Sequence, residues 1–371
     1  MDKIKAYAIK LLNEAGITVN GNNPWDIKVH NDELFREALL KKNLALGEGY
    51  MQGWWDCQAI DQFICKILKA KLNEKIKENW REIIYLIPSI IFNKQNKSGA
   101  KEVAERHYNL GNELFENFLD PYMQYSCAYF LNTEDLAQAQ INKMELICRK
   151  LELKKGDKVL DIGCGWGGLA KYMVEKYGCN VVGINISEKQ IEYAKKFCKG
   201  LPVEIINTDY RDIKGVFDKI VSVGMFEHVG PKNYRTYMKT VYNCLKDDGI
   251  FLLHTIGSNE SEYTCDPWID KYIFPNGTLP SISQIAKAAE ELFVIEDLHN
   301  MGPHYDKTLL CWNRNFQENW NRIKHLYDET FKRMWEYYLL SSAGGFRARH
   351  IQLWQIVMTK EGRTQPYNLR G

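Results

Sequence analysis

The chain has 371 residues, enough for one large domain with an appendage or for two domains. Its 49 basic and 47 acidic residues give a formal net charge of +2, which argues against a general nucleic-acid-binding protein. The ten cysteines include no C-x-x-C pair, so the sequence predicts no zinc site, no other metal site and no disulfide framework.

The first residues predict a helix rather than a targeting signal. Met1 to Asn13 is amphipathic and lacks the apolar core of a signal peptide. The most apolar run, Ile83 to Phe92, is interrupted by Pro88 and is too short to span a bilayer. We therefore expect a soluble, cytoplasmic protein.

Residues 1–92 are predicted to form a first unit. Pro24 to Val29 favours an extended segment, and Glu33 to Lys42 favours a helix with a polar N-cap just before it. Gly47 to Trp55 is rich in glycine and aromatic residues and is interpreted as a loop.

A basic amphipathic helix is predicted from Asp61 to Trp80. Its apolar stripe repeats every four residues and consists of Ile64, Leu68, Leu72, Ile76 and Trp80, with lysines around it. Such a helix can lie on an anionic membrane surface. It can equally pack its stripe against the next domain and leave the lysines in solvent, and the sequence does not decide between the two.

Residues 93–103 form a polar linker, and the second unit follows from 104 to 371. In this unit, strand candidates alternate with helical stretches. The candidates are Val159–Ile162, Asn180–Ile184, Val203–Asn207, Lys219–Val223, Ile250–Thr255, Phe293–Asp297 and Gln352–Met358. The alternation predicts a mostly parallel sheet with helices on both faces. Asn313 to Tyr338 is predicted to be helical and to lie between the last two strands as an insertion or lid.

The glycine turn after the first of these strands is typical of a ligand site. Gly163, Gly165 and Gly168 fit the dinucleotide pattern G-x-G-x-x-G. Asp161 followed by Gly163, Gly165 and Gly167 fits D-x-G-x-G-x-G, which resembles S-adenosylmethionine (SAM) methyltransferases. Glycine is required because a Cβ would block the turn or the ligand.

The tip of the second strand bears on the choice between these ligands. A nicotinamide site needs a carboxylate there to bind the ribose. This strand ends in Asn185-Ile186-Ser187, with no carboxylate. That weakens the nicotinamide interpretation without proving the other.

Polar residues follow three later strands. Glu227 follows the fourth, His254 ends the fifth, and Tyr305 follows the sixth. Because ligands bind outside the carboxyl ends of parallel strands, these side chains could converge on one pocket facing the glycine turn. Each also has a simpler explanation, since Glu227 could cap a helix and a strand-end histidine is more often a core residue. The turn-rich segment from His107 to Phe130 is of the kind that folds over a bound cofactor.

Seven motifs, in order, resemble cyclopropane-fatty-acyl-phospholipid synthases and, more distantly, mycolic acid cyclopropane synthases. They are H-Y-N-L-G-N-E-L-F, Y-S-C-A-Y-F, L-D-I-G-C-G-W-G-G, G-I-N-I-S, M-F-E-H-V-G, L-H-T-I-G and F-R-A-R-x-I-Q-L-W-Q. N-P-W-D-I-K-V-H and G-Y-M-Q-G-W-W-D-C resemble the N-terminal domain of the bacterial enzymes, so the resemblance covers nearly the whole chain. The family lacks the carboxylate after the second strand, which agrees with Asn185.

The resemblance implies an α/β class I SAM-methyltransferase fold: a Rossmann-like, mostly parallel seven-stranded sheet with a smaller, membrane-associated N-terminal domain. It also implies the reaction. A methylene group from SAM is added to the cis double bond of an unsaturated phospholipid acyl chain, and a cyclopropane ring forms through a carbocation and a bicarbonate base. The enzyme would bind the inner face of the membrane peripherally, and relatives are often homodimers.

The resemblance assigns site residues as well. Bicarbonate would be held at Cys127, Glu227, His254, Ile256 and Tyr305. SAM would lie against Tyr125, Ser126, Asp161, Gly163, Gly165, Asn185, Ile186, Gln190, Tyr210 and Arg211, of which the last two vary among relatives. Cys127 is interpreted as a backbone and shape contributor, because nothing beside it in sequence would lower the pKa of its thiol.

Three alternatives remain. A SAM-dependent lipid methyltransferase could resolve the same cation into a methylene or methyl branch with the same pocket. A nicotinamide oxidoreductase is disfavoured by Asn185. A non-enzymatic lipid-binding protein would not need Glu227, His254 and Tyr305 together.

Overall fold

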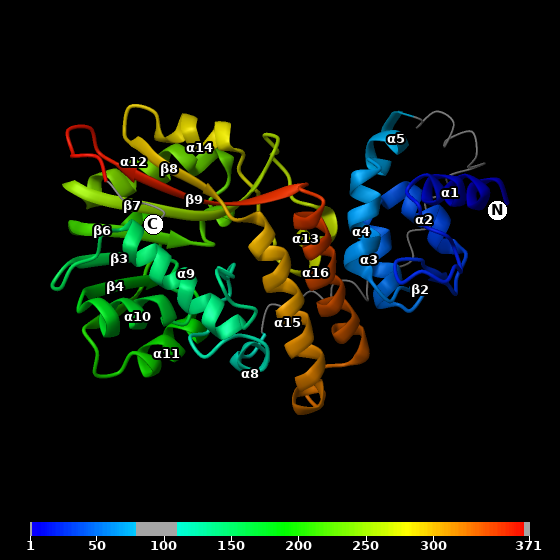
Figure 1. The fold of residues 1–371 in the computed structure, drawn as a ribbon, viewed down its shortest axis with the longest axis horizontal. Coiled ribbons are helices and arrows are strands. Elements are labelled where there is room, and N and C mark those ends of the chain that lie inside the picture. Colours follow the sequence, from blue (N-terminus) through cyan, green and yellow to red (C-terminus); the bar gives the residue numbers. More distant parts are fainter. Residues whose placement is uncertain (1, 79–109, 367–371) are drawn as a thin grey trace. The chain divides into compact units, whose positions relative to one another are not determined.

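The computed structural model describes residues 2–78 and 110–366 (Figure 1). The chain divides into two compact units. The N-terminal unit comprises Met1–Leu110, Cys265–Pro275 and Trp312–His350, and the sheet unit comprises Gly111–Thr264, Asn276–Cys311 and Ile351–Gly371. Two segments from later in the chain therefore belong to the same unit as the N-terminal residues. The predicted units, with boundaries at residues 92 and 104, were continuous stretches of sequence and did not include this exchange. The predicted linker 93–103 and the apolar run Ile83 to Phe92 lie outside the described residues.

A seven-stranded sheet forms the centre of the sheet unit, in the order β5-β4-β3-β6-β7-β9-β8. The strands are β3 (Lys158–Ile162), β4 (Asn180–Asn185), β5 (Val203–Asn207), β6 (Phe217–Val223), β7 (Leu245–Ser258), β8 (Val294–Asn300) and β9 (Ile351–Thr359). Strands β3 to β7 pair in parallel, whereas β9 runs antiparallel to both β7 and β8. All seven predicted strands are present, and the mostly parallel α/β architecture is confirmed.

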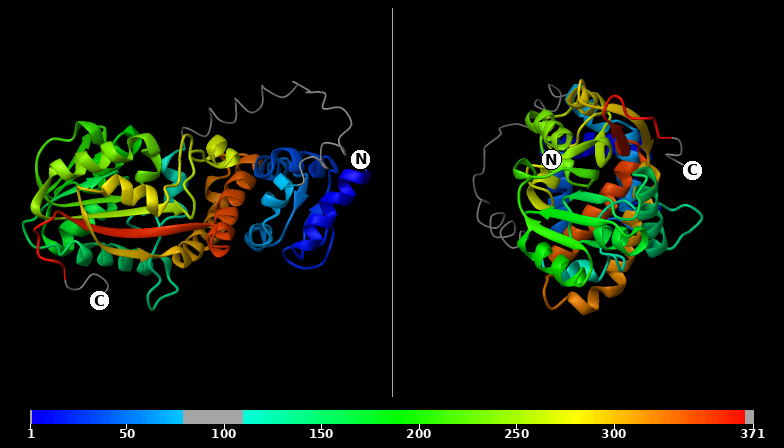
Figure 2. Two further views of the ribbon diagram at one scale, coloured as in Figure 1. Left: turned by 90° about the horizontal axis from the view of Figure 1, so that it is seen from above. Right: turned by 90° about the vertical axis from the view of Figure 1, so that its left-hand side faces the viewer.

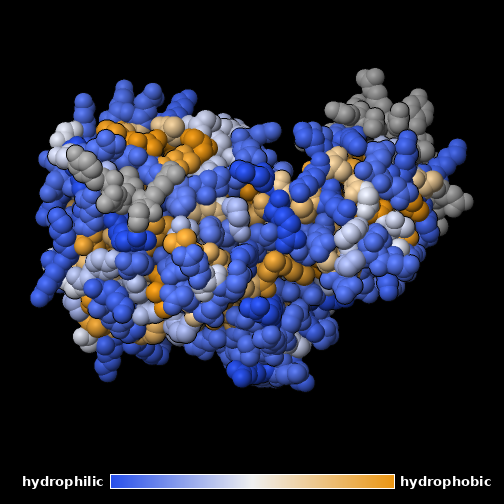
Figure 3. All heavy atoms as spheres, viewed as in Figure 1, coloured by the Kyte–Doolittle hydropathy of each residue, from blue (hydrophilic) through white to orange (hydrophobic). Residues whose placement is uncertain are grey.

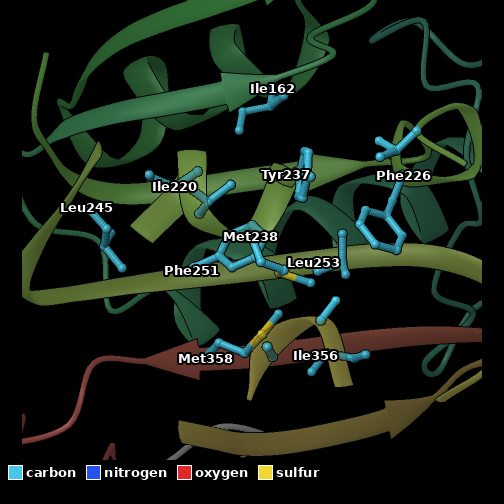
Figure 4. Packing of buried hydrophobic residues seen from close by; sticks show 14 of the residues in the cluster. Ile162, Ile220, Phe226, Tyr237, Met238, Leu245, Phe251, Leu253, Ile356 and Met358 are labelled. Carbon is cyan, nitrogen blue, oxygen red and sulfur yellow. The ribbon is translucent and has the colours of Figure 1, made fainter. Parts of the chain in front are cut away.

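Helices cover both faces of this sheet (Figure 2). They are α8 (Asn112–Glu116), α9 (Leu136–Lys150), α10 (Gly168–Tyr177), α11 (Glu188–Phe197), α12 (Tyr234–Cys244), α14 (Ile282–Ala289) and the start of α15 (Gly302–Ile323). Successive strand residues point to opposite faces, so one face packs Leu160 against α12 and the other packs Val159 against α9 and α10. Figure 4 shows the first core, in which Tyr237 and Met238 of α12 lie over strand residues such as Phe251.

The N-terminal unit is mainly helical. Its elements are α1 (Asp2–Glu14), β1 (Lys28–Val29), α2 (Glu33–Lys41), α3 (Asn43–Met51), β2 (Trp55–Asp56), α4 (Ile60–Lys69), α5 (Leu72–Glu78), α13 (Pro267–Tyr272) and α16 (Glu329–Arg347). The predicted helices at the start of the chain and after residue 32 are confirmed. The predicted extended segment Pro24 to Val29 is strand only in its last two residues, which pair with β2.

The predicted loop from Gly47 to Trp55 is wrong. Most of this stretch is helix α3, and Gly47 lies inside the helix. A Cβ on Gly47 would stand 2.3 Å from Nε1 of Trp268, within the same unit. The glycine therefore allows a bulky indole to pack closely, and does not provide the freedom of a turn.

We expect Gly47→Ala to destabilise the N-terminal unit by about 1–2 kcal/mol, because overpacking outweighs the helix propensity gained. The midpoint of denaturant unfolding measures this loss. Adding Trp268→Leu should relieve the overlap, so that the double variant loses less than the sum of the two single losses. A Gly47→Ala protein more stable than the wild type would contradict the packing explanation.

The single helix predicted from Asp61 to Trp80 is divided. Helix α4 ends at Lys69, and Lys71 has a φ of +53° before α5 begins. Ile64 and Leu72 are buried, and Leu72 packs in a cluster with α1 and α2. Ile64 and Leu72 of the stripe are thus packed inside the protein, Leu68 and Ile76 are half-buried, and Trp80 lies outside the described residues.

Some large apolar side chains are exposed on the described surface. Figure 3 shows a face that is mostly hydrophilic, with hydrophobic residues in small scattered groups. Exposed large apolar residues include Leu131, Tyr263 and the neighbours Val294 and Ile295 on the edge strand β8. None of the described helices combines the length and apolarity needed to cross a bilayer.

Candidate active site

The glycine turn between β3 and α10 has the backbone conformation that its sequence predicts. Gly163, Gly165 and Gly167 have φ values of +83°, +55° and +83°, which side chains with a Cβ rarely adopt. A Cβ on Gly163 would meet Met225 at 2.8 Å, and one on Gly167 would meet Cys198 at 3.0 Å. At Gly165 no described atom lies within 4 Å of that position. Gly165 is therefore the member of the turn that faces open space.

Asn185 joins the tip of β4 to this turn. Its side-chain Nδ2 donates to Gln190 Oε1 at 2.8 Å and to the carbonyl of Gly165 at 3.3 Å. Its Oδ1 accepts from the backbone N–H of Ile186 at 2.8 Å and of Ser187 at 3.2 Å. Ile186 beside it is 71% exposed, although it is apolar. Four predicted SAM-binding residues thus lie together, with an apolar side chain open to a ligand.

Tyr210 and Arg211 follow β5 in a short 3-10 helix, Tyr210–Asp212. The Arg211 guanidinium is bound by Asp209, with Nε 2.7 Å from Oδ1. The Tyr210 ring packs 5.2 Å from the ring of Tyr237. Both predicted residues therefore lie after the carboxyl end of a strand, and Arg211 is held by the carboxylate of its own loop.

The segment before α9 packs against the glycine turn. The Tyr125 ring lies 5.2 Å from Phe115 and 6.5 Å from Trp166, the residue between Gly165 and Gly167. The indole of Trp166 donates to Oδ1 of Asn112 at 2.8 Å. A Cβ on Gly168 would fall 1.8 Å from the carbonyl oxygen of Tyr122. These contacts hold Tyr122 and Tyr125 against the turn, whereas His107 to Asn109 of the predicted segment lie outside the described residues.

Glu227 and Ile256 form the first part of a second cluster. Glu227 lies in the 3-10 helix Phe226–His228 after β6, and its Oε1 accepts from the backbone N–H of Ile256 on β7 at 2.7 Å. Among the described residues, nothing hydrogen-bonds to Oε2 of Glu227. Burial raises the pKa of Glu227 to about 7, so the carboxyl group changes charge near physiological pH.

His254 lies two residues before Ile256 on β7 and is 1% exposed. Its Nδ1 lies 3.2 Å from Nε2 of Gln355, its direct partner on β9, and its Nε2 has no hydrogen-bond partner in the described part of the chain. Burial lowers the pKa of His254 well below its ordinary value, so the imidazole is neutral at physiological pH. If the Gln355 amide nitrogen donates to Nδ1, the ring proton stands on Nε2.

Cys127 and Tyr305 are also buried, on the segment before α9 and on α15. The Cys127 thiol donates to the carbonyl of Ala128 at 3.2 Å, and burial raises its pKa, so it stays protonated. The N–H of Ala128 donates to Oγ1 of Thr308, one turn after Tyr305, at 3.0 Å. This bond ties the Cys127 segment to the helix that carries Tyr305.

Sequence reasoning missed Gln355 and Thr308. A glutamine in the middle of the apolar strand candidate Gln352–Met358 was the available signal for the first. Thr308 lies in a helix of mixed polarity and gave no signal. All of the predicted SAM and bicarbonate residues lie in the sheet unit.

Comparisons with known proteins identify the family. The family model described as mycolic acid cyclopropane synthetase matches residues 95–356. The chain belongs to this family. It is 52% identical to the cyclopropane-fatty-acyl-phospholipid synthase of Escherichia coli K12, over 95% of this chain and 92% of that one. It is therefore a SAM-dependent methyltransferase, as the resemblance predicted.

Other members of the family extend the comparison. A probable fatty acid methyltransferase of Pseudomonas putida is 37% identical, with 71% of each chain covered. The solved structure of the mycolic acid cyclopropane synthase CmaA1 with SAH and CTAB is 33% identical, covers 71% of this chain and 99% of its own, and has a TM-score of 0.64. The class I SAM-methyltransferase fold is thereby confirmed.

Proposed function

We propose that this member of the cyclopropane synthetase family adds a methylene group from SAM to the cis double bond of an unsaturated phospholipid acyl chain. The product is a cyclopropane ring, formed through a carbocation and a bicarbonate base. One structural observation supports the proposal in addition to the family membership. Two buried polar atoms, Oε2 of Glu227 and Nε2 of His254, have no described partner at the carboxyl ends of neighbouring strands.

SAM would bind at the glycine turn. The open space beside Gly165 leaves room for SAM, and Asn185, Ile186 and Gln190 lie next to that space. SAM supplies an electrophilic methyl group, which an alkene can attack if the two are held in line. The residues of the turn and the Tyr125 segment would provide that alignment.

The second cluster suits a small anion with one hydroxyl group. Bicarbonate would supply a compact oxyanion base for the proton that leaves the new methyl group. The Nε2–H of His254 would donate to it, and Oε2 of Glu227 would accept from its hydroxyl group. Buried donors and acceptors without partners are costly, so a ligand that satisfies both atoms fits this site.

Burial of the reacting centre also serves the chemistry. Cys127, Glu227 and His254 are all buried, which keeps bulk water away from them. Water would trap a carbocation as an alcohol before the ring could close. Neutral His254 avoids placing a second positive charge beside that cation.

Binding to the membrane surface remains part of the proposal. Acyl double bonds lie among lipid tails, so the enzyme must reach the bilayer peripherally and reversibly. Ile64 and Leu72 of the stripe are buried, whereas Lys69 and Lys71 beside it are exposed and could contact anionic lipid. A homodimer is likewise proposed from the resemblance alone.

A second product is supported by the relative from Pseudomonas putida, a probable fatty acid methyltransferase. A methylene or methyl branch would arise from the same cation in the same pocket. The nicotinamide interpretation has no such support, since Oδ1 of Asn185 is already used by backbone N–H groups of its own strand tip.

The function is tested by incubating the protein with SAM and vesicles of a mono-unsaturated phospholipid. Acyl chains should gain the mass of one methylene group, and proton NMR should show the high-field resonances of a cyclopropane ring. Olefinic methylene resonances would instead support the second product. If the protein binds SAM but leaves the acyl chains unmodified, both proposed products are contradicted.

A further inference from the structure

Lys143 in the middle of α9 is fully buried, although lysine is almost always exposed. Its ammonium group donates to Oε1 of Gln124 at 2.5 Å and to Oγ of Ser126 at 2.9 Å. A buried charge is retained only where hydrogen bonds and opposite charges compensate it. The position of these partners therefore indicates what the lysine stabilises.

Both partners belong to the segment that packs on the glycine turn. Gln140, one turn earlier on α9, donates to the carbonyls of Ser126 at 2.9 Å and Gln124 at 3.3 Å. On the other side, a Cβ on Gly168 would stand 2.6 Å from Nε2 of Gln124. The segment is thus fixed between α9 and the start of α10, and Lys143 supplies the charged contacts.

The positive charge of Lys143 also acts on Asp161, the carboxyl group that opens the glycine motif. Asp161 is buried, and its Oδ2 has no partner among the described residues. Burial raises the pKa of Asp161, and the positive charge of Lys143 opposes that rise. Burial in turn lowers the pKa of Lys143. Without the lysine, a buried carboxyl group would remain protonated to higher pH.

We propose that Lys143 is a positioning residue for SAM, acting through Ser126 and Gln124 on the segment over the cofactor and through Asp161 on the cofactor's ammonium group. The inference rests on the proposed use of SAM. It adds a residue that does not touch the cofactor and that neither the motifs nor the resemblance indicated. An ionised Asp161 offers its unpaired oxygen to the positively charged amino group of SAM.

Several other titratable groups also interact electrostatically with Asp161 or Lys143. They are Asp120, Cys127, Cys164, Cys198, Tyr237 and His254. Burial raises the pKa of the thiols and the phenol, which stay neutral, and His254 is neutral as well. Asp120 is fixed by backbone N–H groups of Tyr122 and Gln124, each at 2.8 Å. Burial also raises the pKa of Asp120, so the pH dependence of SAM binding is assigned to Asp161 by its loss in the Asp161→Asn background.

The test measures the Kd of SAM by calorimetry for Lys143→Met in the full-length protein. We expect the Kd to rise by about 10- to 100-fold, the size of a lost charge-assisted hydrogen bond. Lys150→Met is the matched control, because Lys150 is equally buried on the same helix but pairs with Asp297 at 3.2 Å. It should lose stability and keep its SAM affinity within about 2-fold. Equal Kd values for the two variants would overturn the proposal.

Two further measurements separate positioning from a loss of folding. In Lys143→Met the pH at which SAM affinity falls should move upward, because Asp161 holds its proton longer. In an Asp161→Asn background that pH dependence should vanish, and Lys143→Met should have a smaller effect. If Lys143→Met does not fold, Ser126→Ala and Asp161→Asn must each weaken SAM binding, or the proposal fails. A wild type that does not bind SAM would instead refute the proposed function.

Discussion

Glu227→Gln should lower turnover by about 10²- to 10⁴-fold while leaving SAM affinity nearly unchanged, because the carboxylate acts at the reacting centre. The amide keeps the acceptor for the N–H of Ile256, so the fold around it is preserved. His254→Ala should behave in the same way. Single-turnover kinetics with vesicle substrate, together with calorimetric titration of SAM, measure the two quantities.

Bicarbonate links these variants to the proposed base. Depleting it in degassed buffer should slow the wild type, and adding it back should restore the rate. In Glu227→Gln the response to added bicarbonate should be weak. If the wild-type rate did not depend on bicarbonate, the proposed roles of Glu227 and His254 in binding it would be wrong.

The same substitution should change stability in a pH-dependent way. The pKa of Glu227 is raised by burial to about 7, so the folded protein binds this proton more tightly than the unfolded chain does. Stability is therefore lost as pH rises through the range from the ordinary pKa of 4.5 to about 7. Glu227→Gln removes that loss and should be more stable than the wild type at pH 8, by up to about 3 kcal/mol. At pH 4 the difference should largely disappear, and unfolding at both pH values checks the sign.

Gly165→Val should raise the Kd of SAM by more than about 100-fold, because the new side chain would occupy the open direction of the turn. Its φ of +55° adds a strain of roughly 1–2 kcal/mol. Gly200→Val is the matched control, since Gly200 also has a positive φ and open space around it but lies after α11, outside the turn. The control should share the strain and keep SAM affinity. Equal SAM affinity in the two variants would mean that the turn is not the cofactor site.

The strands, and the polar residues near their ends, could be predicted because they depend on short local patterns in the sequence. Short apolar runs bounded by turn residues define buried strands, and parallel strands bring their carboxyl ends to one edge. That is why Asn185 ends β4 and Glu227 follows β6 as predicted, whereas His254 lies inside β7, opposite the last residue of β6, and the strand continues to Ser258. Glycine was harder to interpret: Gly165 serves a turn, whereas Gly47 admits the indole of Trp268 inside a helix. The sequence around a glycine does not show which distant side chain approaches it.

The residues that were missed have roles set by distant neighbours. Gln355 reaches His254 because β9 pairs beside β7, and Lys143 reaches Gln124 and Ser126 because its helix packs against their segment. On a helical pattern, Lys143 looks like any solvated lysine. The break at Lys71 had the same cause, since the position of α5 follows from packing on α1 and α2.

The position of β9 between β7 and β8 affects the order in which the protein can fold. Residues 301–350 separate β8 from β9, and part of that stretch contributes α16 to the N-terminal unit. Until β9 is added, β7 has an unpaired edge and β8 has no strand beside it. Closure of such long-range pairs is slow, so the sheet is completed late. His254 gains its Gln355 partner only at that step, so we expect the proposed bicarbonate site to be completed late in folding.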